Sequence, residues 1–237
     1  IAFLLPSFTI SVLAGSLNAA FLPTYVRVKE NEGSKAAQQL LENVTTLFVL
    51  LFVVMCLGLA IISPLIFPLI GSGFSEDKLQ FSRWLFYWLL PLTILKGLST
   101  IWGAVLNTRD QFIIAAIAPI TVPLITIVFI ITASDNLGIY VLVAGMILGF
   151  LLEALILWWA LKEQDLFIRP RWYGYNEAVK QVLHQYLPMV AGSLLMSSTG
   201  IVDQAMAAML NPGDVAALNY GMRIPSFVVG IGSMAIG

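Results

Sequence analysis

Long apolar stretches separated by short polar breaks dominate the chain. An α-helix rises about 1.5 Å per residue, so it needs about 20 mostly apolar residues to cross a hydrocarbon layer about 30 Å thick. The stretches lack the apolar/polar alternation of membrane-spanning strands, and helices are therefore predicted. Seven windows are long enough, at residues 6–26, 44–70, 84–106, 112–132, 138–161, 187–210 and 216–237.

The breaks between these windows are rich in Gly, Asn, Asp and Pro, which favour turns. Most of them are short, so neighbouring helices are predicted to be antiparallel. Only residues 163–180 are long enough to form a surface element. There Asn176 is predicted to cap a short amphipathic helix through Tyr186, while Trp172, Tyr173 and Tyr175 suit the headgroup layer.

Composition supports a membrane protein. The 237 residues are 59% hydrophobic and 11% charged, with a mean hydropathy of +0.91, whereas a soluble domain carries about 25% charged residues. The net charge of −1 gives no basic field that would recruit nucleic acid. A single cysteine, Cys56, excludes an internal disulfide scaffold.

The distribution of Lys and Arg predicts which loops face the cytoplasm, because short cytoplasmic loops are enriched in these residues. One set of alternate loops is rich in them and the other holds only Lys78 and Arg83. The sequence therefore predicts that loops 27–43, 107–111 and 162–180 are cytoplasmic. The basic residues of these loops are Arg27, Lys29, Lys35, Arg109, Lys162, Arg169, Arg171 and Lys180.

Four ionisable residues, Lys96, Glu153, Asp203 and Arg223, lie within the predicted spans or near their ends. An unpaired charge there costs about 2.5 to 3.5 kcal/mol on insertion scales, so each is expected to face a partner or a watery cavity. Structural alternatives remain open. Arg223 could extend outward to the interface, Lys96 could form a structural bridge with Glu153, and Asp203 could bond to neighbouring Ser and Thr hydroxyls.

The sequence lacks several motifs that mark other classes of protein. It contains no phosphate-binding loop, dinucleotide fingerprint, paired cysteine or histidine cluster, so we expect no cofactor and no metal. It also contains no recognisable set of nucleophile, base and orienting residue, and we do not expect an enzyme. Prolines and a glycine within the spans are predicted to bend or hinge the helices: Pro6, Gly15, Pro23, Pro91 and Pro225.

Five stretches together resemble the MurJ/MviN family, the bacterial lipid II flippases of the multidrug/oligosaccharidyl-lipid/polysaccharide exporter superfamily. They occur in the family's order along nearly the whole chain. The matching stretches are Ala2-Phe3-Leu4-Leu5-Pro6, the run from Leu13 to Tyr25, the segment from Pro91 to Phe112 containing Gly103-Ala104-Val105-Leu106-Asn107-Thr108, Leu187-Pro188 with Asp203, and the run from Ala217 to Pro225.

The resemblance implies an all-α integral membrane protein, a transmembrane helix bundle that is a fragment of a fourteen-helix, two-lobe transporter, covering about helices two to eight. Residues 1–165 would form most of the N-terminal lobe, 166–180 a cytoplasmic amphipathic linker, and 181–237 the start of the C-terminal lobe. Arg223 aligns with a cavity arginine that would meet a pyrophosphate. Asp203 aligns with a frequent acidic position, while Lys96 and Glu153 depart from the family pattern.

The leading hypothesis is a flippase that moves an undecaprenyl-pyrophosphate-linked glycan, lipid II or a related lipid-linked oligosaccharide, across the bacterial inner membrane by alternating access. Its substrate contacts would be Arg223 and Lys96, with Asp203 and Glu153 shaping the cavity or coupling an ion. We expect it to act as a monomer surrounded by membrane lipids. Two alternatives remain open: a cation-coupled multidrug-type exporter, and a non-transporting scaffold of the cell envelope.

Overall fold

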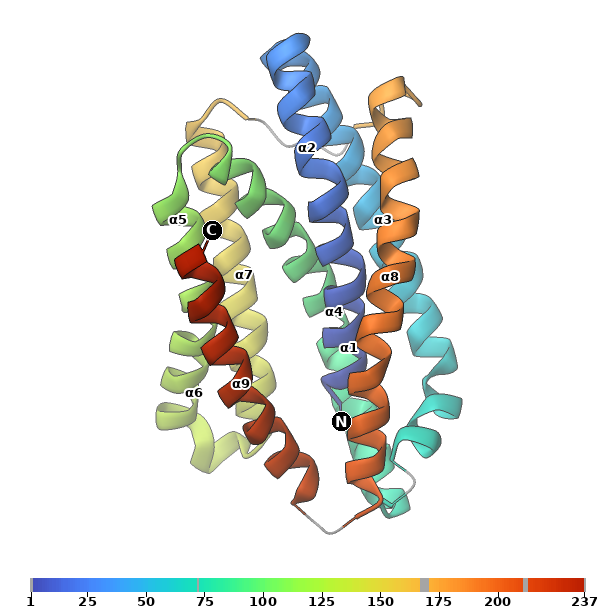
Figure 1. Ribbon diagram of the computed structural model, residues 1–237. Helices are drawn as coiled ribbons and strands as arrows, with labels where there is room; N and C mark the ends of the chain where they lie inside the picture. Colours follow the sequence, from blue (N-terminus) through green and yellow to red (C-terminus); the bar gives the residue numbers. More distant parts are fainter. Residues whose placement is uncertain (1, 72, 167–170, 211–212, 237) are drawn as a thin grey trace.

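The computed structural model describes residues 2–71, 73–166, 171–210 and 213–236, with only the backbone for 134–137, 224 and 227–236. Every element in these ranges is helical, and the helices lie side by side as a bundle (Figure 1). Their bounds are α1 Leu4–Thr9, the π-helical turn η1 Ile10–Ala14, α2 Gly15–Asn31, α3 Ser34–Ile70, α4 Glu76–Asn107, α5 Phe112–Ile117, the 3₁₀ turn η2 Ala118–Ile120, α6 Thr121–Leu137, α7 Tyr140–Glu163, α8 Glu177–Ala208 and α9 Asp214–Ile236.

Five of the seven predicted spans are confirmed as helices long and apolar enough to cross a membrane, among the described residues. The remaining two windows, 187–210 and 216–237, fall in α8 and α9. Among the described residues, neither helix meets the same criterion. That α8 and α9 cross the membrane stays a prediction.

The structure corrects three of the predicted boundaries. Residues 27–43 were expected to form a loop, but α2 continues to Asn31 and α3 begins at Ser34, because the Ala- and Gln-rich stretch after Gly33 favours a helix despite its polarity. The amphipathic helix expected to end at Tyr186 runs on through Pro188 as α8. The break expected between the windows 112–132 and 138–161 is instead helical, because α6 continues to Leu137.

Polar connections gather at the two ends of the bundle, as antiparallel neighbours require. The links after α2, after α4 and after α7 lie at one end, and those after α3, α6 and α8 lie at the other (Figure 1). The Asn176 cap is confirmed, since its side chain accepts a hydrogen bond of 2.9 Å from the backbone N–H of Val179. The proposed boundary of the two lobes within 166–180 stays a prediction.

Close packing sets the position of α7 against α6. Gly145 and Gly149 lie on the α7 face that meets α6, and a methyl group added at Gly149 would come within 2.7 Å of the Val122 Cα. Small residues four apart let helix backbones approach closely in membranes. Because α7 is held in this way, the side chain of Glu153, one turn further along, has a defined place in the bundle.

Candidate functional site

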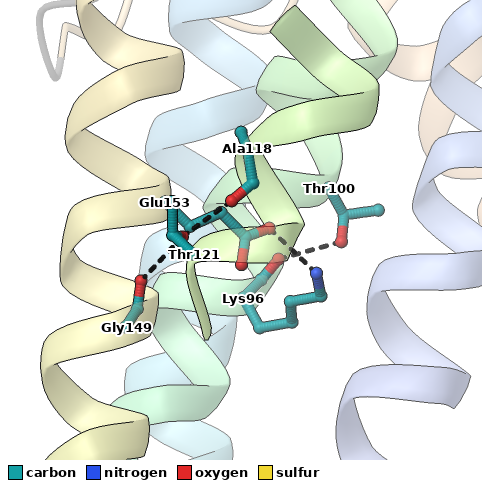
Figure 2. A network of polar contacts seen from close by, with 6 residues as sticks. All are labelled: Lys96, Thr100, Ala118, Thr121, Gly149 and Glu153. Atoms are coloured by element: carbon teal, nitrogen blue, oxygen red, sulfur yellow. Dashed lines mark hydrogen bonds and ion pairs between the residues drawn. The ribbon is translucent and has the colours of Figure 1, made fainter. Parts of the chain in front are cut away.

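Lys96 and Glu153 form an ion pair in the middle of the bundle. Lys96 Nζ lies 2.9 Å from Glu153 Oε1, and the two side chains come from α4 and α7 (Figure 2). Glu153 is only 1% exposed, whereas the Lys96 side chain is 29% exposed. The structural bridge left open by the sequence is therefore formed, and it is asymmetric: the carboxylate is sealed and the ammonium is partly accessible.

Threonine hydroxyls bond to backbone carbonyls around this pair, and one of these bonds joins α6 to α7. The Thr121 hydroxyl at the start of α6 donates to the Ala118 carbonyl at 2.7 Å and lies 3.3 Å from the Gly149 carbonyl on α7 (Figure 2). On α4, the Thr100 hydroxyl donates to the Lys96 carbonyl at 2.8 Å. The Phe150 ring lies with its centroid 5.7 Å from Lys96 Nζ, which adds a cation–π contact.

A polar pocket of about 240 Å³ opens beside the ion pair. Three oxygens in its lining residues are buried and have no hydrogen-bond partner among the described residues: Asn18 Oδ1, Ser99 Oγ and the second carboxylate oxygen of Glu153, Oε2. Buried polar atoms normally have partners. The complete lining is Asn18, Leu22, Lys96, Ser99, Thr100, Gly103, Ala104, Asn107, Ala115, Pro119, Glu153 and Leu157.

This arrangement presents one cation and several hydrogen-bond acceptors to the same space. The Lys96 ammonium can donate three hydrogen bonds, of which Glu153 Oε1 takes one. An anionic group in the pocket could take another without separating the pair. The acceptors Asn18 Oδ1 and Glu153 Oε2 suit hydroxyl groups or water, since a single water needs about 30 Å³. The pocket therefore suits a ligand that combines negative charge with hydroxyls.

The other two predicted site residues lie apart from this pocket. Arg223 on α9 is exposed in the described chain, and its guanidinium carbon lies 6.0 Å from the ring centroid of Tyr220. Asp203 on α8 is also exposed. The Ser198 and Thr199 hydroxyls donate to the backbone carbonyls of Leu195 and Met196 rather than to Asp203, as the structural alternative for Asp203 would require.

The predicted hinge residues all lie within or at the start of helices. Pro6 is in α1, Gly15 is the first residue of α2, Pro23 is inside α2, Pro91 is inside α4 and Pro225 is inside α9. Between the first two, Ile10–Ala14 form a π-helical turn. Such single turns often occur at functional sites. The hinge role of these five residues stays a prediction, and the π turn marks one place where it can be tested.

The contacts between α2 and α8 do not follow from the sequence pattern. The Ser16 hydroxyl lies 2.9 Å from the Ser193 hydroxyl, and Arg27 donates a hydrogen bond to the Gln181 side chain. These contacts join the predicted N-terminal lobe to the start of the predicted C-terminal lobe. Only the small side chains on one face of each helix hint at them in the sequence.

A second unexpected contact ties the segment before α8 to α3. The backbone N–H of Tyr173 donates to Asn43 Oδ1 at 2.7 Å, and the Tyr173 hydroxyl donates to Glu42 Oε2 at 2.8 Å. Both α3 residues are buried, Asn43 completely. In the sequence, the only sign of this contact is a carboxylate and an amide placed directly before an apolar run. Such groups need hydrogen-bond partners when they are buried.

Comparison with known proteins gives consistent results. The family model described as "Lipid II flippase MurJ" matches residues 1–237. A lipid II flippase MurJ from Burkholderia cenocepacia is 26% identical over 251 residues, covering 100% of this chain and 48% of that protein. A solved structure of lipid II flippase MurJ in an inward closed conformation superposes with a TM-score of 0.75 at 21% identity, covering 97% of this chain and 48% of that one.

The fold also matches a wider group of transporters. An inward-facing multidrug resistance transporter of the MATE family superposes with a TM-score of 0.74 at 18% identity, covering 95% of this chain and 53% of that one. The chain spans about half the length of the curated relatives that it matches. Among the described residues, no group of three or more His, Cys, Asp or Glu side chains gathers as a metal site would require.

Proposed function

Because the chain belongs to the MurJ family, we propose that it is part of a flippase that carries lipid II, or a related undecaprenyl-pyrophosphate-linked glycan, across the bacterial inner membrane by alternating access. The observation that carries the proposal, beyond family membership, is the pocket beside Lys96. It places a partly accessible cation and unpartnered oxygens along the last third of α4, on the proposed path of a sugar-phosphate headgroup.

Each part of the pocket has a role in this proposal. Lys96 contacts a phosphate oxygen while it keeps its bond to Glu153, so the negative charge of the ligand meets a cation that is already held in place. Asn18 and Ser99 accept hydrogen bonds from hydroxyls of the glycan. Glu153 orients Lys96 through its carboxylate oxygen Oε1. Buried polar groups thereby gain the partners that they lack in the protein alone.

Arg223 is the second proposed phosphate contact. A guanidinium matches two phosphate oxygens in a bidentate way, which an ammonium cannot do. Its side chain is exposed and rests near the Tyr220 ring, and it is in neither of the ion pairs found among the described residues. Asp203 on α8 is proposed to balance the charge of the cavity or to hold a coupling ion. The end of the bundle that carries the links after α2, α4 and α7 is proposed to face the cytoplasm.

The test uses the full-length protein in a bacterial strain depleted of its own lipid II flippase. Arg223→Ala is expected to abolish rescue of growth, and Arg223→Lys to restore it only in part, because charge returns without bidentate geometry. Arg83→Ala is the matched control and is expected to rescue fully. Undiminished rescue by Arg223→Ala would remove the proposed anchor, and expression of each variant is verified on membranes.

A cation-coupled exporter is the second candidate, and one observation favours it. Glu153 Oε2 is a buried carboxylate oxygen with no partner among the described residues, beside the acceptors Asn18 Oδ1 and Ser99 Oγ. Such oxygens also suit a coupling cation. Sodium- or proton-dependent efflux of a cationic dye, without rescue of the flippase-depleted strain, would support this candidate over the flippase. If the protein is a scaffold without transport, replacing any of the four charged residues would change neither growth rescue nor dye efflux.

A further inference from the structure

An apolar groove of about 540 Å³ runs between α3 and α8, and Leu17 of α2 also lines it. It is separate from the polar pocket and shares no residue with it. The polar side chains of its lining are two tyrosines, Tyr175 and Tyr186. The lining consists of Leu17, Val44, Leu47, Phe48, Leu50, Leu51, Val54, Tyr175, Val179, Val182, Leu183, Tyr186 and Leu187.

The groove opens onto a face of α3 that is suited to lipid. Five large apolar side chains on α3 follow one another at intervals of three or four residues and are all more than half exposed: Leu50, Val54, Leu57, Ile61 and Leu65. This spacing places them on one side of the helix. The first two of them also line the groove, so its mouth is continuous with this exposed apolar face.

The length of the groove matches one leaflet of a bilayer. It follows α3 from Val44 to Val54 and α8 from Val179 to Leu187, which are stretches of about 15 Å and about 12 Å at a rise of about 1.5 Å per residue. The hydrocarbon layer of a membrane is about 30 Å thick. A groove of this length and volume therefore accommodates one acyl chain from one leaflet.

Basic side chains flank the end of the groove nearest the start of α8. Lys180 follows the lining residue Val179, and its counter-charge is Glu177 at 3.8 Å, itself 92% exposed. Arg171 is exposed, and its backbone carbonyl accepts a hydrogen bond of 3.2 Å from the Thr46 hydroxyl on α3, which places its backbone near the same end. The buried carboxylate nearby, Glu42, is already engaged by Gln38 and Tyr173.

We propose that this groove binds an anionic phospholipid, with one acyl chain between α3 and α8 and its phosphate beside Lys180 and Arg171. A zwitterionic lipid would bring its own cation to the two basic side chains and gain less from them, so phosphatidylglycerol binds more tightly than phosphatidylcholine. The bound chain bridges helices of the two predicted lobes. This site is distinct from the pocket beside Lys96 and does not depend on the flippase proposal.

The test is native mass spectrometry of the full-length protein, released from micelles containing phosphatidylglycerol or phosphatidylcholine. The wild type is expected to retain one phosphatidylglycerol at least several-fold more strongly than phosphatidylcholine. Leu183→Trp, which fills the groove, and Lys180→Gln, which removes a flanking charge, each reduce that retention several-fold. Lys35→Gln removes an exposed lysine from the same end of α3, away from the groove, and is expected to retain the lipid fully.

Three outcomes would overturn the proposal. They are equal retention of the two lipids, unchanged phosphatidylglycerol retention in Leu183→Trp, and an equal loss in Lys35→Gln. Displacement of the phospholipid by a lipid-linked pyrophosphate in the wild type, with no displacement in Leu183→Trp, would assign the groove to the substrate chain instead. Thermal unfolding of each variant in detergent identifies a loss that comes from misfolding, and Leu183→Ile then replaces Leu183→Trp as a milder change of groove shape.

Discussion

Replacing either member of the Lys96–Glu153 pair is expected to destabilise the protein, but by unequal amounts. Lys96→Met removes the cation and leaves Glu153, which is 1% exposed, as an unpaired charge in the bundle. Glu153→Gln removes the negative charge and leaves Lys96, whose side chain is 29% exposed and borders the polar pocket. Water in the pocket can solvate the ammonium but reaches the carboxylate far less.

The expected magnitudes follow from this asymmetry. Removing one partner of a buried pair costs about 3 to 5 kcal/mol, because the other charge stays buried without compensation. Lys96→Met should fall in this range. Glu153→Gln should cost about 1 to 2 kcal/mol, close to the loss of one charged hydrogen bond, since the amide can still accept from Lys96. The double variant leaves no unpaired charge and should cost less than the two single changes together.

Chemical unfolding of the full-length protein in detergent micelles measures these differences in the free energy of unfolding. The double-mutant cycle then isolates the interaction between the two residues. Lys162→Met is a suitable control, because this lysine lies at the end of α7 beside the Trp158 ring, and is expected to change stability by less than about 1 kcal/mol. Equal effects of the two single variants, or additive effects in the double variant, would refute the asymmetry argument.

Three further predictions concern helix contacts. Gly149→Val is expected to destabilise the protein by about 2 kcal/mol, since its Cβ would meet the α6 backbone at 2.7 Å; unfolding in detergent measures this. Asn176→Ala is expected to cost about 1 kcal/mol through loss of the α8 cap, by the same measurement. Ser16→Cys with Ser193→Cys, in a Cys56→Ala background, is expected to cross-link under oxidation and block transport, because the two hydroxyls lie 2.9 Å apart.

Each of these three predictions has a control. Gly58→Ala adds a methyl group where nothing lies within 4 Å and should be neutral or slightly stabilising. Asn176→Ser keeps a capping oxygen and should preserve stability. Reduction of the cross-link should restore transport. A Gly149→Val variant as stable as the wild type, an Asn176→Ser variant as weak as Asn176→Ala, or transport undisturbed by a complete cross-link would contradict the respective contact.

The apolar windows located most helices correctly, because helix formation in a membrane depends on local sequence. Each backbone N–H in a helix bonds to a carbonyl four residues earlier, so about 20 apolar residues suffice to define a span. The same logic failed at 27–43, where a polar stretch remains helical beyond the apolar window. Hydropathy reports where a helix is buried in lipid, not where its hydrogen bonds end.

The candidate site was only partly accessible to sequence reasoning. Lys96 and Glu153 could be identified because a charged side chain inside the membrane is energetically costly and needs a partner. It could not identify Asn18 or Ser99, which are common in membrane helices and carry no charge. Their place in the pocket depends on how α2 and α4 are rotated about their axes. That rotation is set by packing against several helices at once.

The sequence by itself determined the membrane class of the protein, most of its helices, its family and the identity of the costly charges. Only the tertiary structure decided that Lys96 meets Glu153, 57 residues further along the chain, and that Tyr173 is held by Asn43. Helices form through bonds between near neighbours, whereas these contacts depend on the angles and rotations at which separate helices pack. A sequence pattern with a period of one helical turn does not encode those angles.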